Sequence, residues 1–374
     1  MRVLLDATAV PADRGGVGRY VDEIAPEIAL TGVHLAMVVQ SRDVDHYTRL
    51  VPEATIIAAP AWVVKRPLRM VWEQIGLPAL IRRVRPDVLH SPHYTLPLFA
   101  GVPVVVTLHD ATFFTTPELH LSSKAVFFRT AIRVASRRAA GLVTPSKATR
   151  DEVVRLVGAK PEKFAVAYHG VDHAMFHPAS QAEQDRVRAT LDITETTYVG
   201  FLGTLEPRKN VPALIRAWVR ACAGRTEPPA LVLAGGRGWD AAIDDAVAAV
   251  PAGLTVRVPG YLPLADLPAF LGGSIVLAYP SLGEGFGLPV LEAMACGTAV
   301  LTTRELSLPE VGGDAVAYCG TDEASIASEL AALLEDPVRR AYLAEVAVER
   351  AATFTWAQAA RDHVAAYEAA LRAG

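Results

Sequence analysis

Short apolar runs alternate with stretches of helical periodicity along most of the chain. In the first half these runs cover residues 3–7, 34–39, 87–91, 102–110, 141–146 and 164–170. In the second half they cover residues 198–204, 230–236, 255–261, 275–281, 299–303 and 315–320. The runs predict buried strands, and the helical stretches between them predict the crossover helices of parallel sheets. The expected fold class is therefore α/β.

A polar segment separates the two sets of predicted strands. It begins at His177-Pro178, so we place a linker over residues 176–196. The chain of 374 residues is long enough for two domains of roughly 100–200 residues each. We predict a doubly wound, Rossmann-like domain over 1–175, a second over 197–354, and a cleft between them, since ligands often bind at domain interfaces. Apolar residues recur at helical spacing within the last segment, 355–374.

Composition narrows the class of protein. The chain is 51% hydrophobic and 20% charged, which favours a large core over disorder. Its three cysteines, Cys222, Cys296 and Cys319, have no metal-ligand spacing, and a reducing, cytoplasmic setting is expected. No apolar run reaches the roughly 18 residues of a membrane span.

Charge is unevenly distributed between the two halves of the chain. Residues 1–175 hold 21 Lys and Arg against 16 Asp and Glu, whereas the remainder holds 15 against 24. A basic first half would suit an anionic membrane or substrate. Scatter of charge over solvated helices explains the bias equally well.

Residues 283–297, GEGFGLPVLEAMACG, form the most informative segment. Glycines flank Glu284, Pro289 is expected to start a helix, and Gly297 is expected to end it, which puts Glu292 about one turn inside. A helix N-terminus offers free N–H groups to an anion, and the two carboxylates can accept hydrogen bonds from hydroxyl groups. The segment therefore fits a sugar nucleotide.

A basic pair supplies a second candidate site. Arg208 and Lys209 lie in GTLEPRKN, residues 203–210, between a predicted strand and a helix that starts near Val211. Arginine offers a planar fork of donors to a phosphate, and lysine offers a point charge. Such a pair is often merely solvated, but the carboxyl edge of a parallel sheet is where α/β folds bind ligands.

Two further motifs lie in the first half. GGVGRY, residues 15–20, nearly matches a dinucleotide-binding fingerprint, but Val21 replaces the third glycine, so a phosphate-binding turn and a plain turn remain open. His109 and Asp110 close the most hydrophobic predicted strand. His109 could donate a hydrogen bond to a substrate or serve as a structural partner, and Asp110 could orient its ring or cap the next turn.

Several chemistries find no support in the sequence. It contains no His/Cys cluster with zinc spacing, no P-loop and no G-x-S-x-G elbow. Its basic stretches lack the interleaved aromatic residues typical of a nucleic-acid surface. Residues 122–138 mix basic and apolar positions, so this helix could lie on an anionic membrane or pack its apolar face on the sheet.

These motifs resemble a known family. The chain looks like a retaining glycosyltransferase of the GT-B fold, of the family-four and group 1 type that uses nucleotide-sugar donors. The motifs occur in the family's order along essentially the whole chain: 15–18, His109-Asp110, TPSKAT (144–149), HGVD (169–172), GTLEPRKN (203–210), PGYL (259–262) and 283–297. The paired glutamates are the most specific of them.

The resemblance implies roles for individual residues. Arg208 and Lys209 would hold the donor diphosphate, Glu284 would contact hydroxyls of the transferred sugar, and Glu292 would accept hydrogen bonds from the ribose. His109, with Asp110 beside it, would lie near the reacting carbon. The remaining expected contacts are Gly16 with the diphosphate, Tyr261 and Leu262 with the base, and the backbone amides of Phe286, Gly287 and Leu288 with the sugar and distal phosphate. The last helix would cross back onto the first domain.

The expected function is transfer of a hexose to a hydroxyl acceptor with retention and without a metal ion or cofactor. The variant GTLEPRKN resembles that of mannosyltransferases, so GDP-mannose is favoured as donor and a UDP-sugar is the alternative. A glycan, a glycolipid or a small molecule could be the acceptor, and no nucleic acid is expected. The alternatives are an epimerase or hydrolase of the same fold, a non-catalytic nucleotide-sugar-binding protein and, more distantly, a nicotinamide oxidoreductase. A cytoplasmic protein is expected, with residues 122–138 as the candidate contact to the inner face of the membrane.

Overall fold

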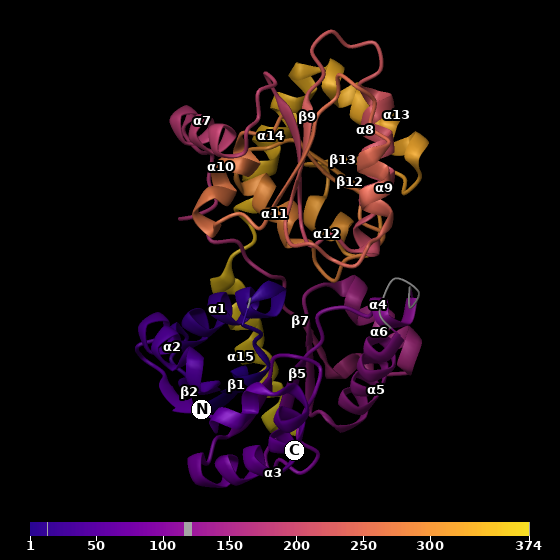
Figure 1. Cartoon of the computed structure of the whole chain (residues 1–374). Coiled ribbons are helices and arrows are strands. Elements are labelled where there is room, and N and C mark those ends of the chain that lie inside the picture. Colours follow the sequence, from indigo (N-terminus) through magenta and orange to yellow (C-terminus); the bar gives the residue numbers. More distant parts are fainter. Residues whose placement is uncertain (13, 116–121, 374) are drawn as a thin grey trace. The chain divides into compact units, whose positions relative to one another are not determined.

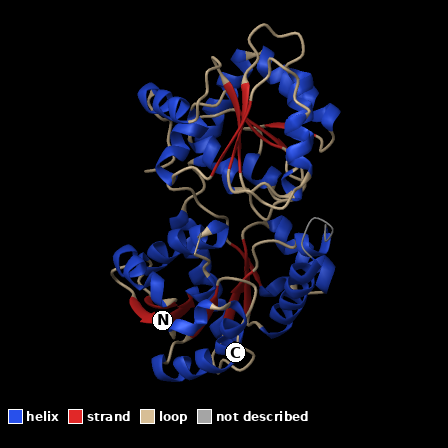
Figure 2. Cartoon of the chain, viewed as in Figure 1, coloured by secondary structure: helices blue, strands red, loops and turns tan. Residues whose placement is uncertain are grey.

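The computed structural model describes residues 1–12, 14–115 and 122–373 and divides the chain into two compact units. The first unit is Met1–Gly170 together with Thr355–Gly374, and the second is Val171–Phe354. Each unit contains one parallel sheet with helices packed on both of its faces (Figure 2). This architecture confirms the predicted α/β class and the two Rossmann-like sheets.

The sheet of the first unit has seven parallel strands in the order β3-β2-β1-β4-β5-β6-β7. They are β1 (Arg2–Asp6), β2 (His34–Val39), β3 (Thr55–Ala58), β4 (Val88–Ser91), β5 (Val104–Thr107), β6 (Gly141–Thr144) and β7 (Phe164–Val166). Among the strands described, only β3 was not predicted from the sequence. This edge strand is short and no residue in it is fully buried, so it lacks an apolar run.

The helices of the first unit cover this sheet. They are α1 (Gly15–Leu30), α2 (Val44–Leu50), α3 (Arg66–Val84), α4 (Thr112–Thr115), α5 (Ser122–Arg138), α6 (Lys147–Val157) and α15 (Trp356–Ala373). Although α15 ends the chain, it packs beside α1 and against β4 to β7, as the yellow helix in Figure 1 shows.

Buried hydrogen bonds anchor α15 in the first unit. The Tyr367 hydroxyl lies 2.8 Å from His90 Nδ1, and His90 Nε2 lies 2.8 Å from Thr107 Oγ1. The Tyr20 hydroxyl of α1 lies 2.6 Å from His363 Nε2 of α15. Since these polar groups are buried, each depends on its partners to offset the cost of desolvation.

The sheet of the second unit has six parallel strands in the order β10-β9-β8-β11-β12-β13. They are β8 (Tyr198–Leu202), β9 (Ala230–Ala234), β10 (Val256–Gly260), β11 (Val276–Tyr279), β12 (Val300–Thr303) and β13 (Ala317–Cys319). The direction in which successive strands are added reverses between β8 and β11. In open α/β sheets ligands bind at the carboxyl ends of the strands at such a switch point.

The helices of the second unit complete its core. They are α7 (Gln181–Thr190), α8 (Val211–Ala221), α9 (Ala242–Ala248), α10 (Leu267–Gly272), α11 (Leu288–Ala295), α12 (Leu308–Gly312), α13 (Glu323–Glu335) and α14 (Pro337–Ala351). Helix α7 lies within the segment 176–196 that we expected to be a linker. A capping box of Ser180 and Glu183 starts it, and it packs against α10.

Candidate functional site

The basic pair lies at the carboxyl edge of β8. After this strand the chain forms a short 3-10 turn, Pro207–Lys209, and α8 then begins at Val211 as predicted. Asn210 reverses the chain between turn and helix with a φ of 59°, a conformation that asparagine tolerates better than most residues. Its side-chain amide donates to the carbonyl oxygen of Thr321 at 2.8 Å, which fixes the reversal.

A close approach of two loops supports the segment that carries this pair. The N–H of Leu205 donates to the carbonyl oxygen of Gly236 at 2.9 Å. Gly235 has a φ of 133°, and a Cβ at this position would lie 2.1 Å from the carbonyl oxygen of Gly203. Only glycine permits this contact, which holds the loop after β8 against the loop after β9.

Glu284 reaches the same place from the neighbouring strand. It follows β11 and lies beside the basic pair at the switch point of the sheet. Lys209 Nζ lies 2.6 Å from Glu284 Oε1, and Arg208 Nη1 lies 2.6 Å from Glu284 Oε2. Lys209 and Glu284 are both buried. The structure thus brings together the two cations and the first glutamate of the paired-Glu segment.

Two hydroxyl groups that were not predicted from the sequence complete the cluster. Ser281 Oγ donates to Glu284 Oε1 at 2.6 Å, and the Tyr279 hydroxyl donates to the same oxygen at 2.9 Å. Tyr279 in turn accepts a hydrogen bond from Lys209 Nζ at 2.5 Å. Glu206 pairs with Arg208 Nη2 at 2.7 Å. The feature that could have identified Tyr279 as a site residue is its position as the last residue of a buried strand at the switch point.

The cluster changes the pKa values of its members. Burial alone would raise the pKa of Glu284, but Arg208, Lys209 and the hydrogen bonds from Lys209 and Ser281 outweigh it and lower the pKa to about 2. Burial, aided by Arg208, lowers the pKa of Lys209, although Glu284 opposes this. Burial and the charge of Glu284 raise the pKa of Tyr279 well above its usual value. Glu284 is therefore a carboxylate at neutral pH, and Tyr279 keeps its proton.

The remaining residues of the paired-Glu segment lie in the same loop and the helix after it. Helix α11 begins at Leu288, one residue before the predicted Pro289, because Gly287 caps it with a φ of 108°. Ser307 Oγ donates to the carbonyl oxygens of Glu284 and Phe286, each at 2.8 Å, and so holds the loop. Glu292 is buried in the second turn of α11, in agreement with its predicted position.

Tyr261 and Leu262 lie further from this cluster along the sheet. They follow β10, which is separated from β8 by β9. Tyr261 is exposed, and its ring lies so close to the backbone of Gly236 that a Cβ there would come within 2.5 Å. Tyr261 therefore covers the loop that supports the segment with Arg208.

The first unit holds the other predicted site residues. Gly16 belongs to the first turn of α1, so the turn expected over residues 15–20 lies earlier, at Arg14, which has a φ of 56°. The ring of His109 packs edge-on against Tyr20, and its Nε2 lies 2.7 Å from the carbonyl oxygen of Pro92. Burial lowers the pKa of His109, and Asp110 partly offsets this effect.

Of the two roles expected for Asp110, orienting the ring of His109 or capping the next turn, the structure shows the second. Its Oδ1 accepts hydrogen bonds from the N–H and the hydroxyl of Thr112, at 3.2 and 3.0 Å. Asp110 therefore caps the turn that leads into α4.

Two family models match the chain in succession. Residues 14–175 match the model of Glycosyltransferase Family 4, and residues 183–350 match that of Glycosyl transferases group 1. Together the two models account for most of both units. The chain belongs to the GT-B glycosyltransferases.

Individual glycosyltransferases are similar to this chain in sequence or in structure. This glycosyltransferase is 29% identical over 314 residues to O-antigen chain mannosyltransferase B of Escherichia coli, an alignment that covers 82% of this chain and 79% of that protein. It is 36% identical over 253 residues to a D-inositol 3-phosphate glycosyltransferase of Salinispora tropica, which covers 62% of this chain and only 51% of the relative. A structure of Anabaena HepE in complex with UDP-glucose matches 98% of each chain with a TM-score of 0.77 at 18% identity, which shows the shared fold.

Within residues 1–12, 14–115 and 122–373, no group of three or more His, Cys, Asp or Glu side chains is placed to hold a metal ion. None of the helices in the same ranges is both long and apolar enough to cross a bilayer. In α5, which carries the candidate membrane contact, Phe128, Ile132 and Ala135 pack into the core of the first unit while Val126 is exposed, so the membrane contact of this helix stays a prediction.

Proposed function

We propose that the enzyme transfers a hexose, with mannose favoured, from a nucleoside diphosphate sugar to a hydroxyl acceptor with retention of configuration. The observation that carries this proposal is the cluster of half-buried Arg208 with buried Lys209 and Glu284 at the switch point of the second sheet. GDP-mannose is favoured because GTLEPRKN resembles the variant of mannosyltransferases and because a relative is named a mannosyltransferase.

The cluster explains how a diphosphate would be held. The positive charges of Arg208 and Lys209 are balanced in the free protein by Glu206 and Glu284. A diphosphate would compete with the Glu284 carboxylate for these cations, and the carboxylate that is released could accept hydrogen bonds from sugar hydroxyls. The N-terminus of α11 and its preceding loop would add backbone N–H groups at Phe286, Gly287 and Leu288.

The same groups would stabilise the transition state. When the bond between the anomeric carbon and the diphosphate oxygen breaks, negative charge grows on the departing phosphate. Two preorganised cations would stabilise this charge, so the proposal needs no metal ion. The acceptor oxygen would bond to the anomeric carbon from the same face, and its proton would pass to a phosphate oxygen. This accounts for retention without a second carboxylate as nucleophile.

The first test is a panel of nucleoside diphosphates. We expect one of GDP, UDP, ADP and dTDP to raise the melting temperature clearly above the others, since a ligand at 100 times its Kd adds about 2.7 kcal/mol of stability. The matching sugar nucleotide should then release this diphosphate only in the presence of an acceptor. Release in water alone would indicate a hydrolase, binding without turnover would indicate a sensor, and a flat panel would contradict the proposal.

A further inference from the structure

The exposed side of α3 carries an unusual concentration of large apolar side chains. Seven of the sixteen large hydrophobic residues exposed within the described ranges lie between residues 62 and 99. On α3, Ile75 is 69% exposed and Val71 is 52% exposed. We define the α3 surface as Trp62, Leu68, Val71, Ile75, Leu98 and Phe99. Scattered single residues are normal on a protein surface, but a contiguous group marks an interaction site.

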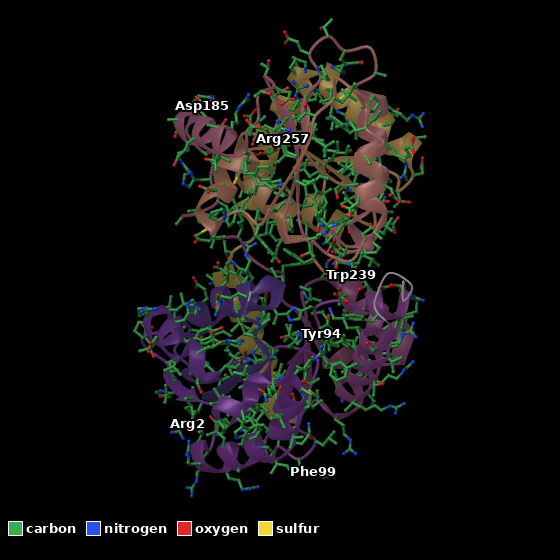
Figure 3. All side chains as sticks on the ribbon, viewed as in Figure 1. Arg2, Tyr94, Phe99, Asp185, Trp239 and Arg257 are labelled. Atoms are coloured by element: carbon green, nitrogen blue, oxygen red, sulfur yellow. The ribbon has the colours of Figure 1, made fainter. Side chains whose placement is uncertain are left out.

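Helical spacing, a hydrogen bond and the packing of the 3-10 turn Ala61–Val64, which holds Trp62, against α3 bring these residues together. Leu68, Val71 and Ile75 are three and four residues apart, so they share one side of the helix. The loop with Leu98 and Phe99 is held to α3 because the N–H of Leu98 donates to Gln74 Oε1 at 3.0 Å. Figure 3 labels Phe99, which is 81% exposed, at the end of the first unit where Figure 1 labels α3.

Folding does not require this surface to be apolar. The other side of α3 already contributes Trp72, Leu77 and Ile81 to the core of the first unit. An exposed Ile75 or Phe99 adds nothing to that core. The apolar character of the exposed side therefore calls for another contact.

The charges around the α3 surface indicate the chemistry of its partner. Between residues 61 and 85 the exposed charged side chains are all basic, namely Lys65, Arg66, Arg82, Arg83 and Arg85. The one acidic residue of this segment, Glu73, is buried and pairs with the buried Arg69 at 3.1 Å. A second copy of the chain would bring the same positive charges face to face, which opposes a symmetric dimer. An anionic surface is complementary to them.

We propose that the α3 surface docks the first unit onto an anionic lipid bilayer, with its apolar side chains in the headgroup boundary and its basic residues against lipid phosphates. A helix with an apolar exposed side, flanked by aromatic residues and with basic residues beside it, suits this boundary. Each basic residue near an anionic surface adds to the attraction. The contact differs from the one expected for residues 122–138 and does not depend on which donor the enzyme uses.

The test is co-sedimentation of the full chain with vesicles of phosphatidylcholine, with and without about one third phosphatidylglycerol. We expect binding to the anionic vesicles, and an Ile75→Glu/Phe99→Glu variant should weaken it at least about tenfold. Val338→Glu is the matched control, because Val338 is 78% exposed on α14 of the second unit. Unchanged thermal unfolding and nucleotide binding would show that both variants fold.

Three results would overturn the proposal. They are absence of binding to anionic vesicles, equal binding by the double variant, and equal binding to vesicles of phosphatidylcholine alone. Light scattering of the protein without vesicles tests the alternative that a second copy of the chain binds the α3 surface. A dimer that the double variant abolishes would assign the α3 surface to a second copy of the chain.

Discussion

Replacing Glu284 with glutamine removes the negative charge of this side chain and keeps its size. The amide can keep hydrogen bonds with Ser281 and Tyr279, but it no longer neutralises Arg208 and Lys209. A carboxyl pKa that falls from 4.5 to about 2 corresponds to about 3 kcal/mol in favour of the charged form. Breaking a buried ion pair typically costs about 3–5 kcal/mol. We therefore expect the free energy of unfolding of the nucleotide-free enzyme to fall by about 3 kcal/mol.

The same substitution should strengthen the binding of a nucleoside diphosphate. In the variant the two cations have lost one carboxylate, and the diphosphate no longer has to displace it. We expect about tenfold tighter binding of the free nucleotide, or about 1.4 kcal/mol. Turnover of the sugar nucleotide should instead fall at least about tenfold, because Glu284 would no longer accept hydrogen bonds from the sugar.

Hydrogen exchange of the β8 and β11 amides measures the stability of the second unit, and calorimetric titration measures nucleotide affinity. Glu323→Gln is the control, since Glu323 pairs at the surface with Arg216 and Arg220 of the same unit. Such exposed pairs contribute little, and neither quantity should change. Weaker nucleotide binding by Glu284→Gln would refute the idea that carboxylate and diphosphate compete for the same cations.

Three other predictions concern both units. Tyr279→Phe removes the hydroxyl that accepts a hydrogen bond from Lys209 and donates one to Glu284. We expect kcat/KM for the sugar nucleotide to fall about tenfold and the free energy of unfolding to fall by about 1–2 kcal/mol, and unchanged kinetics would contradict a positioning role. Burial lowers the pKa of His363 to about 4, so its protonation favours the unfolded chain. The resulting contribution of about 3 kcal/mol to the free energy of unfolding should be present above pH 6.5 and lost as the pH falls from 6.5 through 4. Exchange of α1 and α15 amides should show this loss, and His363→Gln should reduce its pH dependence whereas exposed His34→Gln should not. Gly235→Ala should cost about 3 kcal/mol or more in denaturant unfolding because its Cβ meets the Gly203 carbonyl, whereas Gly224→Ala, with open space around it, should cost about 1 kcal/mol.

Most of the fold could be predicted because buried parallel strands are nearly continuous apolar runs. Strand β3 escaped because it lies at the sheet edge with half-buried residues. We expected a turn where α1 begins, because glycine is a poor helix former and local propensity alone favours a turn there. Nothing in local propensity shows that Arg14 makes the reversal first.

The candidate site was only partly predictable from local patterns. Arg208, Lys209 and Glu284 were found because glycine and proline mark the loops in which they lie. Their mutual pairing was not predicted, because it depends on β8 and β11 being neighbours in the sheet. Tyr279 was missed for a related reason, since a tyrosine at the end of an apolar run looks like an ordinary core residue until its hydroxyl is seen between Lys209 and Glu284.

The proposed function depends on binding of the donor diphosphate by Arg208 and Lys209. Calorimetric titration of Lys209→Met with the nucleotide that stabilises the wild-type enzyme tests it most directly, with Lys160→Met, at an exposed position, as control. We expect Lys209→Met to bind this nucleotide about 100-fold more weakly, or about 2.7 kcal/mol, while the control binds as the wild type does. Equal affinities in all three proteins would contradict it.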